Sequence, residues 1–349
     1  MSQAALVVDG AIPVDAGRSL SGGQRTRRLR TAFVLSLVLA ALFVSPPWEE
    51  ISGQGLPDRD NYVFTIDAFA AEGTQQFEIF GTKTSTLLFT EHLWVELLIL
   101  IANTFSDAKD GLLILSFLAT MLAVSQIILR AGLKYAILYL ASPLTIDLFM
   151  SQTRSGLALG LFLCALSVRR SKLKYLLMLC SVGMHSFAVV LLSLYALNAF
   201  LLWRTSVSMR ARVLTVLLIG LAAGAVWATL SPYILFALGD RRALLLEFMP
   251  VTLGFMLWST SLTALLIGFA HIYRDRSNGQ HVLFAVALMA MYVCSGALGA
   301  GGASTTRFLS LAMPFVFVTI SAIPQSAIRS SAVTAIVLFN VIHFSYWMA

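Results

Sequence analysis

Charged residues are scarce in this chain. Only 12% of its 349 residues are Asp, Glu, Lys or Arg, whereas 58% are hydrophobic and the mean hydropathy is +0.84. In soluble globular domains about 25% of the residues are charged. The composition therefore excludes an ordinary soluble domain. The longest polar stretch after the N-terminal tail is the segment 46–90.

Cysteine is rare and the common catalytic motifs are missing. Cys164, Cys180 and Cys294 all lie inside apolar runs, which indicates packing rather than a disulfide framework or a zinc site. The chain contains no HExxH, P-loop or GxSxG motif. These absences argue against soluble-enzyme chemistry.

The basic residues do not indicate nucleic-acid binding. The formal net charge is +7, but the basic residues form short clusters beside hydrophobic runs, as topology signals do under the positive-inside rule. The clusters occupy the segments 25–30, 169–174, 204–212 and 274–276. We therefore expect contact with membrane lipid and none with nucleic acid.

Apolar runs of about 17 to 22 residues recur along the chain, and about 20 residues of helix span the hydrocarbon of a bilayer. These runs begin near Thr31, Gly111, Tyr135, Arg154, Leu173, Val213, Val251, His281, Arg307 and Ala332. The pattern predicts an all-α polytopic membrane protein with about eleven crossings. Residues 1–30 are predicted to be a disordered cytosolic tail, and 31–349 a single transmembrane helical domain.

The basic clusters also predict how the chain is threaded. They leave the segment 46–90 outside, and its seven acidic and two basic residues suit an external loop. The segment 91–105 is too short to cross and is predicted to be an interfacial or re-entrant helix on the outer face. The run 173–203 has basic residues at both flanks, so we expect two half-helices that meet at 183–186, with the break on the outer side.

This threading brings five ionisable residues to the outer side of the membrane. They are Asp60, Glu91, Arg154, His185 and Arg307. Ionisable groups at membrane depth usually pair, line a polar cavity or serve a mechanism. Each has an alternative explanation, because an arginine at the start of a span can snorkel to the interface and a histidine at a helix break can be hydrogen-bonded inside the protein. Their shared facing favours one functional site.

A short acidic pattern lies in the external loop. Asp58-Arg59-Asp60 resembles the Asp-x-Asp pattern with which many glycosyltransferases hold a divalent metal on a sugar diphosphate, and hard cations favour carboxylate oxygens. An ordinary solvated loop or turn is the competing interpretation. We therefore assign no metal ligands and expect no cofactor, with a divalent metal as the open alternative.

Several short motifs carry a resemblance to a known family. The segment 149–158, FMSQTRSGLA, is followed by a basic turn and by the segment 178–192 around His185. Asp60-x-Tyr62, Glu91-His92-Leu93-Trp94 and Arg307-Phe308 flank this core. In layout, residues 31–345 resemble the EpsG family of exopolysaccharide polymerases, which belongs to the wider Wzy-type group of bacterial O-antigen and polysaccharide polymerases.

The resemblance implies a GT-C-like glycosyltransferase of the bacterial inner membrane, with the loop 46–90 and the active site facing the periplasm. Such enzymes join lipid-linked repeat units and use an undecaprenyl-diphosphate-linked glycan as donor and as acceptor. A chain-length regulator and a flippase are the protein partners that this implies. The alternatives are an O-antigen ligase-like enzyme, a membrane acyltransferase, and a transporter or flippase for a lipid-linked solute.

The resemblance also suggests roles for the candidate residues. Arg154 and Arg307 would bind the diphosphate and offset the charge that develops on it, with Arg241 and Arg242 as weaker candidates. Tyr62 and Gln152 would contact the substrate. The base that takes the acceptor proton would be Asp60, Glu91 or His185. We favour a carboxylate as the base, with His185 contacting sugar or phosphate.

Overall fold

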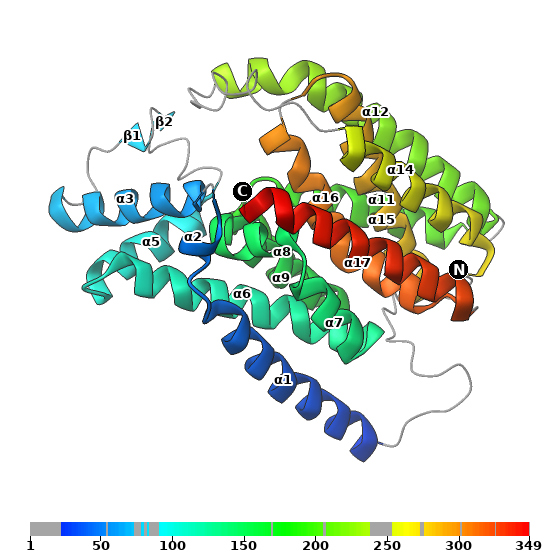
Figure 1. Ribbon diagram of the computed structural model, residues 1–349, viewed down its shortest axis with the longest axis horizontal. Helices are drawn as coiled ribbons and strands as arrows, with labels where there is room; N and C mark the ends of the chain where they lie inside the picture. The colour runs from blue at the N-terminus through cyan, green and yellow to red at the C-terminus, as the bar shows by residue number, and fades with distance from the viewer. Residues whose placement is uncertain are drawn as a thin grey trace, which may run out of the picture.

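The computed structural model describes residues 22–53, 55–72, 78–79, 82–83, 91–168, 170–204, 207–237, 253–272, 276–300, 302–324 and 326–348. Within this part of the chain the fold is α-helical, apart from two paired two-residue strands. In chain order the elements are α1 (Gly22–Val44), α2 (Trp48–Ile51), α3 (Pro57–Glu72), β1 (Glu78–Ile79), β2 (Thr82–Lys83), α5 (His92–Thr104), α6 (Ala108–Ala131), α7 (Leu133–Leu140), α8 (Pro143–Ile146), the π-helical turn η1 (Asp147–Ser151), α9 (Thr153–Ser167), α10 (Ser171–Met184), α11 (Ala188–Trp203), α12 (Met209–Ala237), α14 (Leu253–Gly268), the 3-10 turn η2 (Ala270–Ile272), α15 (Arg276–Ala297), α16 (Gly302–Ser321) and α17 (Ser326–Met348) (Figure 1).

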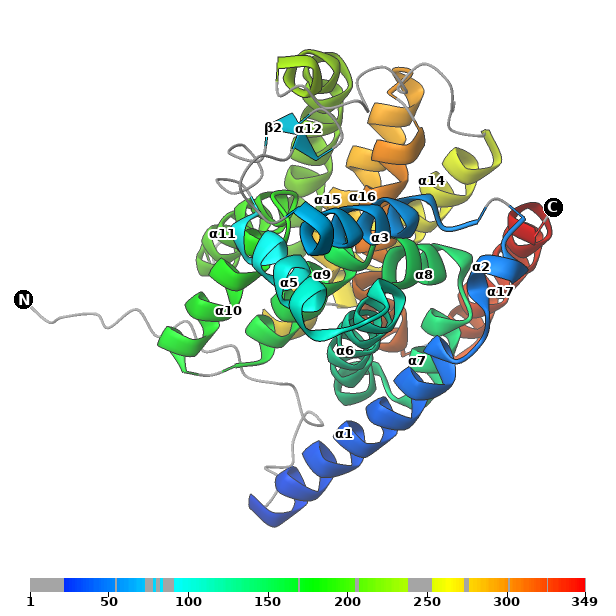
Figure 2. The same cartoon turned by 90° about the vertical axis from the view of Figure 1, so that its left-hand side faces the viewer.

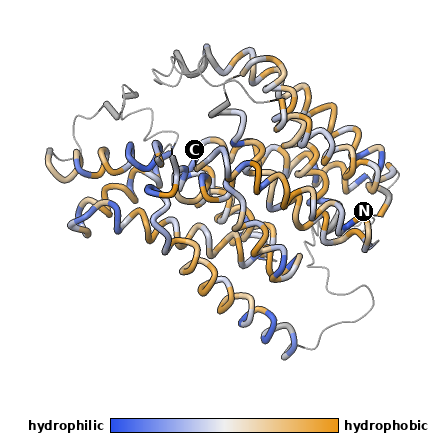
Figure 3. Tube along the Cα trace, in the orientation of Figure 1, coloured by the Kyte–Doolittle hydropathy of each residue, from blue (hydrophilic) through white to orange (hydrophobic). Residues whose placement is uncertain are grey.

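Four described helices, in α6, α12, α15 and α17, are long and apolar enough to cross a membrane by length and composition. The bent pair of α7 with α8 and η1 raises this number to five if it counts as one span. Shorter apolar helices lie in α5, α9, α11, α14 and α16. The prediction of a helical, membrane-embedded protein is therefore confirmed at this level (Figure 3).

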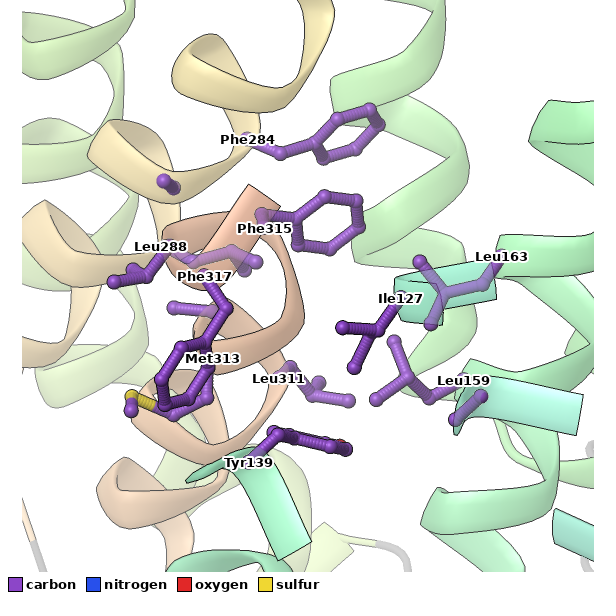
Figure 4. Close-up of a cluster of buried hydrophobic side chains, with 14 of the residues drawn as sticks. Ile127, Tyr139, Leu159, Leu163, Phe284, Leu288, Leu311, Met313, Phe315 and Phe317 are labelled. Carbon is purple, nitrogen blue, oxygen red and sulfur yellow. The ribbon is translucent and has the colours of Figure 1, made fainter. Parts of the chain in front are cut away.

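The core is built around α15. Its residues from Val282 to Tyr292 are all buried, which is the pattern of a helix that is apolar on every side and surrounded by others. Phe284 stacks on Phe315 of α16 with ring centroids 4.6 Å apart (Figure 4). The Phe284 ring also meets Phe162 of α9 edge-on.

Two opposite ends of the helical body are distinguished by charge. At the end where α6 begins, Asp107 caps the helix, Asp110 stands in its first turn, and Glu49 pairs with Lys109 at 2.9 Å. At the other end of α6, Arg28 donates to the Leu129 carbonyl and Arg130 contacts His281 at 2.7 Å. We call these the acidic end and the basic end.

The helices α3 and α5 form a separate layer across the acidic end (Figure 2). They share a second hydrophobic cluster with the start of α6, which includes Ile66, Phe69, Leu98 and Leu112. The sequence placed α5 correctly as a short helix, whereas α3 lies in a stretch that was interpreted only as an external loop. The apolar residues of α3 recur at helical spacing, and this pattern explains the helix.

The predicted single crossing near Tyr135 is bent. The axes of Leu133–Leu140 and Pro143–Ser151 meet at 79°. Pro143 disfavours helical geometry at the preceding residue, and Ser142 has extended dihedrals. The predicted break in the run 173–203 is present, because α10 ends at Met184 and α11 begins at Ala188.

Candidate functional site

Glu91 lies at the centre of a buried polar cluster at the acidic end. The residue caps α5, and its carbonyl accepts from the backbone amides of Trp94 and Val95, while its side chain makes no capping bond to that helix. One carboxylate oxygen meets Arg154, and the other accepts from Nδ1 of His185 at 2.5 Å and from the Ser186 hydroxyl at 3.1 Å. Because only 3% of Glu91 is exposed, each of these contacts is shielded from water.

The Glu91 carboxylate binds at the break between α10 and α11. His185 ends α10 in an extended conformation, so the Ser186 amide, which lies between α10 and α11, has no helical partner. The Ser186 amide donates to Glu91 at 3.2 Å. A carboxylate at the start of a helix is also favoured by the helix dipole. The broken helix thus creates the binding site for the Glu91 carboxylate.

The neighbouring charges keep Glu91 ionised. Burial by itself would raise the pKa of this carboxyl group, but Arg154 and then His185 outweigh that effect and hold the pKa well below its usual range. His185 thereby has Nδ1 committed to Glu91, and its buried Nε2 makes no hydrogen bond within the described residues.

Arg154 stands in the first turn of α9, between the carboxylate and an aromatic wall. Its guanidinium carbon lies 6.0 Å from the ring centroid of Tyr62, within cation–π range. The Tyr62 ring packs edge-on against Trp94 with centroids 4.9 Å apart. Burial raises the pKa of Tyr62 to about 12, so its hydroxyl remains protonated at neutral pH.

Arg307 brings a second guanidinium to the same place from α16. It donates to Asp58 at 3.1 Å, and 11% of its side chain is exposed. The Tyr62 hydroxyl lies within electrostatic range of both ion pairs, that of Arg154 with Glu91 and that of Arg307 with Asp58.

The acidic partner of Arg307 is Asp58 and not the predicted Asp60. Residues two apart on an α-helix point about 200° away from each other. Asp58 shares the face of α3 that carries Tyr62, whereas Asp60 is exposed. The two carboxylates of the Asp-x-Asp pattern therefore do not face a common point, and Arg59 between them pairs with Glu49 at 3.3 Å. Among the described residues no three His, Cys, Asp or Glu side chains gather as metal ligands would.

Gln152, a predicted site residue, contacts Asp147, which was not predicted from the sequence. Gln152 is buried, and its amide nitrogen donates to Asp147 at 2.6 Å. Asp147 stands in η1, which packs against α3, and its carboxyl group lies within electrostatic range of Asp58 and Arg307. It is the only acidic residue in the apolar stretch 135–150, and that position was the available signal.

The structure thus brings Glu91, Arg154, His185, Arg307 and Tyr62 together at the acidic end, and Gln152 joins them through Asp147. Arg241 and Arg242 lie outside the described residues. Compared with protein-family models, curated proteins and solved structures, the chain shows no significant similarity.

Proposed function

We propose that this chain is a GT-C-like membrane glycosyltransferase, a polymerase that joins undecaprenyl-diphosphate-linked oligosaccharide repeat units. Its active site would face the periplasm from the inner membrane, and a flippase and a chain-length regulator would act beside it. The observation that supports this most is the convergence of two arginines, 153 residues apart in the sequence, on one partly open polar site at the end of an apolar helical body.

The two arginines fit the leaving group of such a reaction. When the glycan moves to its acceptor, the bond to the lipid diphosphate breaks and negative charge collects on the phosphate oxygens. Guanidinium groups match phosphate oxygens with paired donors, and fixed positive charge lowers the barrier as that charge develops. Both side chains keep a small exposed area, 13% for Arg154 and 11% for Arg307, through which a phosphate would reach them.

Without a ligand, Arg154 is already paired with Glu91, and Arg307 is already paired with Asp58. An incoming diphosphate must therefore replace one of the carboxylates. Asp58 is the more exposed, at 31% of its side chain, whereas Glu91 is held by three segments. We infer that Asp58 yields Arg307 to the diphosphate, and that Glu91 stays in place to orient Arg154 and His185.

The test compares arginine variants of the purified protein in nanodiscs. Lipid-linked oligosaccharides extracted from the native host serve as substrate, and product is measured as a ladder on a glycan-size gel. R307A and R154K should lose the ladder, R154K because lysine keeps the charge but lacks the planar fork of donors. R210A, an exposed arginine at the start of α12, is the matched control and should form the ladder normally.

Binding of undecaprenyl diphosphate, followed by native mass spectrometry, separates the leaving-group role from other defects. Full-length polymer made by both R307A and R154K would overturn the assignment. A single transfer to a different lipid acceptor by the wild type would favour a ligase, and translocation of the lipid-linked glycan without transfer would favour a flippase.

A further inference from the structure

Asp147 is unusual in its surroundings. From Ser142 to Gly160 every residue is buried except two, Asp147 and Arg154. The stretch includes the end of the bent pair and the first half of α9, so it crosses the interior of the protein. The two side chains that retain exposure are also the two ionisable ones. Arg154 lies beside the Tyr62 ring, and Asp147 lies within electrostatic range of Arg307.

The local backbone holds Asp147 in this position. It begins the π-helical turn η1, a rare conformation that is frequent at functional sites. The amide of Gln152 donates to the Asp147 carbonyl at 2.8 Å, and the Gln152 side chain donates to Asp147 Oδ2 at 2.6 Å. Gln152 thus fixes both the main chain and the carboxylate.

The other carboxylates of the site are poorly placed to accept a proton. Glu91 is bound by Arg154, His185 and Ser186, and its pKa is held low. Asp60 is on the exposed face of α3, and Asp58 pairs with Arg307 until the diphosphate displaces it from the site. Asp147 accepts from the Gln152 side chain, lies near the Ser151 side chain, and stays partly exposed within electrostatic range of Arg307.

We propose that Asp147 is the general base of the transfer reaction, positioned by Gln152. This inference rests on the proposed function. The carboxylate takes the proton of the acceptor hydroxyl, whose oxygen forms the new bond to the anomeric carbon of the donor. The bond from that carbon to the diphosphate breaks, and the undecaprenyl diphosphate leaves with the electron pair and is bound by Arg154 and Arg307. Asp147 then releases its proton to water.

The experiment measures three variants in the nanodisc assay with the same extracted lipid-linked oligosaccharides. D147N removes the basic oxygen and keeps the shape, and loss of a general base lowers the turnover rate by about 10²–10⁴-fold. D147A should regain part of its rate when formate is added as an external carboxylate. D110N is the control, because Asp110 is an exposed acid at the same end of the molecule.

Binding of undecaprenyl diphosphate distinguishes catalysis from structure. D147N should bind it at least as tightly as the wild type, because the variant removes a negative charge near Arg307. If the D147N turnover rate stays within about threefold of the wild type, the decrease is smaller than the decrease expected for loss of a base. That result would overturn the role of Asp147 and leave the polymerase proposal intact. Loss of both turnover and binding, or no rescue by formate, would show that Asp147 supports the structure only. A wild type without any ladder would overturn the proposed function and this role with it.

Discussion

At the scale of single residues, Glu91 connects parts of the chain that are far apart. Its carboxylate joins the start of α5 to Arg154 in α9 and to the break between α10 and α11. A buried charge of this kind is costly to leave unpaired, and removing one partner from a buried ion pair typically costs about 3–5 kcal/mol. Glu91 is therefore expected to matter for stability as well as for function.

The substitution E91Q tests this expectation. Glutamine has nearly the same shape but leaves Arg154 and His185 without their anion, so the free energy of unfolding should fall by about 3–5 kcal/mol. E96Q changes an exposed glutamate on the same helix and should have little effect. Unfolding in detergent, followed by circular dichroism, compares the two. Equal stability of E91Q and E96Q would contradict the central role of Glu91.

The difference in stability between the wild type and E91Q should depend on pH, in a direction that follows from the pKa of Glu91. The folded-state pKa of Glu91 lies below its unfolded value, so its stabilisation is fully present above the unfolded pKa of about 4.3 and is lost as the pH falls toward the folded pKa. The difference in stability between wild type and E91Q should stay constant from about pH 8 to pH 5 and shrink below about pH 4. A transition near neutral pH would show that another group controls the pair.

At the scale of helices, α12 and α15 are in unusually close contact. A Cβ atom added at Gly220 would lie 2.6 Å from the Ala287 carbonyl oxygen, and one added at Gly224 would lie 2.6 Å from that of Met291. These glycines are four residues apart and share one helix face. Small residues at this spacing allow two helix backbones to approach each other inside a membrane.

The substitution G220A should therefore destabilise the protein by about 1–3 kcal/mol, because a carbonyl of the neighbouring helix must move. G254A is the matched control, since an added Cβ there meets nothing within 4 Å and alanine is the better helix former. The melting temperatures of the two variants in the same detergent provide the comparison. A G220A protein as stable as G254A would contradict the close packing of α12 against α15.

Helix positions were largely predictable, because hydrophobic length and flanking charge are local signals. The predicted segment 91–105 became α5, and the break expected at 183–186 is found at 185–187. The 79° bend before Pro143 and the helix α3 were not predicted. The proline and the helical spacing of Tyr62, Ile66 and Phe69 were visible, but the surrounding packing decides whether such signals take effect.

The candidate site was predictable only in part, because the rotation of a helix and a local backbone turn place some of its residues. Glu91, Arg154 and His185 stand at helix boundaries, where an ionisable residue is conspicuous in the sequence. The choice of Asp58 over Asp60 depends on the rotation of α3, and the participation of Asp147 depends on the π-helical turn. Neither geometry is encoded in a short motif.

At the scale of the whole molecule, charge is separated between the two ends of the helical body. The candidate site and its carboxylates lie at the acidic end, and Arg28 and Arg130 lie at the basic end. Under the positive-inside rule the basic end belongs in the cytoplasm. This orientation would expose the site to the periplasmic side, as the proposed function requires.

Thiol labelling at the two ends of α6 checks this orientation. Lys109 and Lys134 are exposed at the acidic and the basic end, respectively. With the three native cysteines replaced, a membrane-impermeant maleimide should label K109C in intact spheroplasts and K134C only after the membrane is permeabilised. The reverse pattern would place the site in the cytoplasm and remove the basis for a periplasmic polymerase.

The π-helical turn has a consequence for how this sequence can change over time. A π-turn contains one residue more than the α-helical turn it replaces, and each residue rotates an α-helix by about 100°. Deleting one residue between Ile146 and Gln152 would restore regular helix and turn Arg154 away from Glu91 by roughly that angle. Homologous proteins that keep the site should therefore tolerate substitutions in this segment but no change in its length.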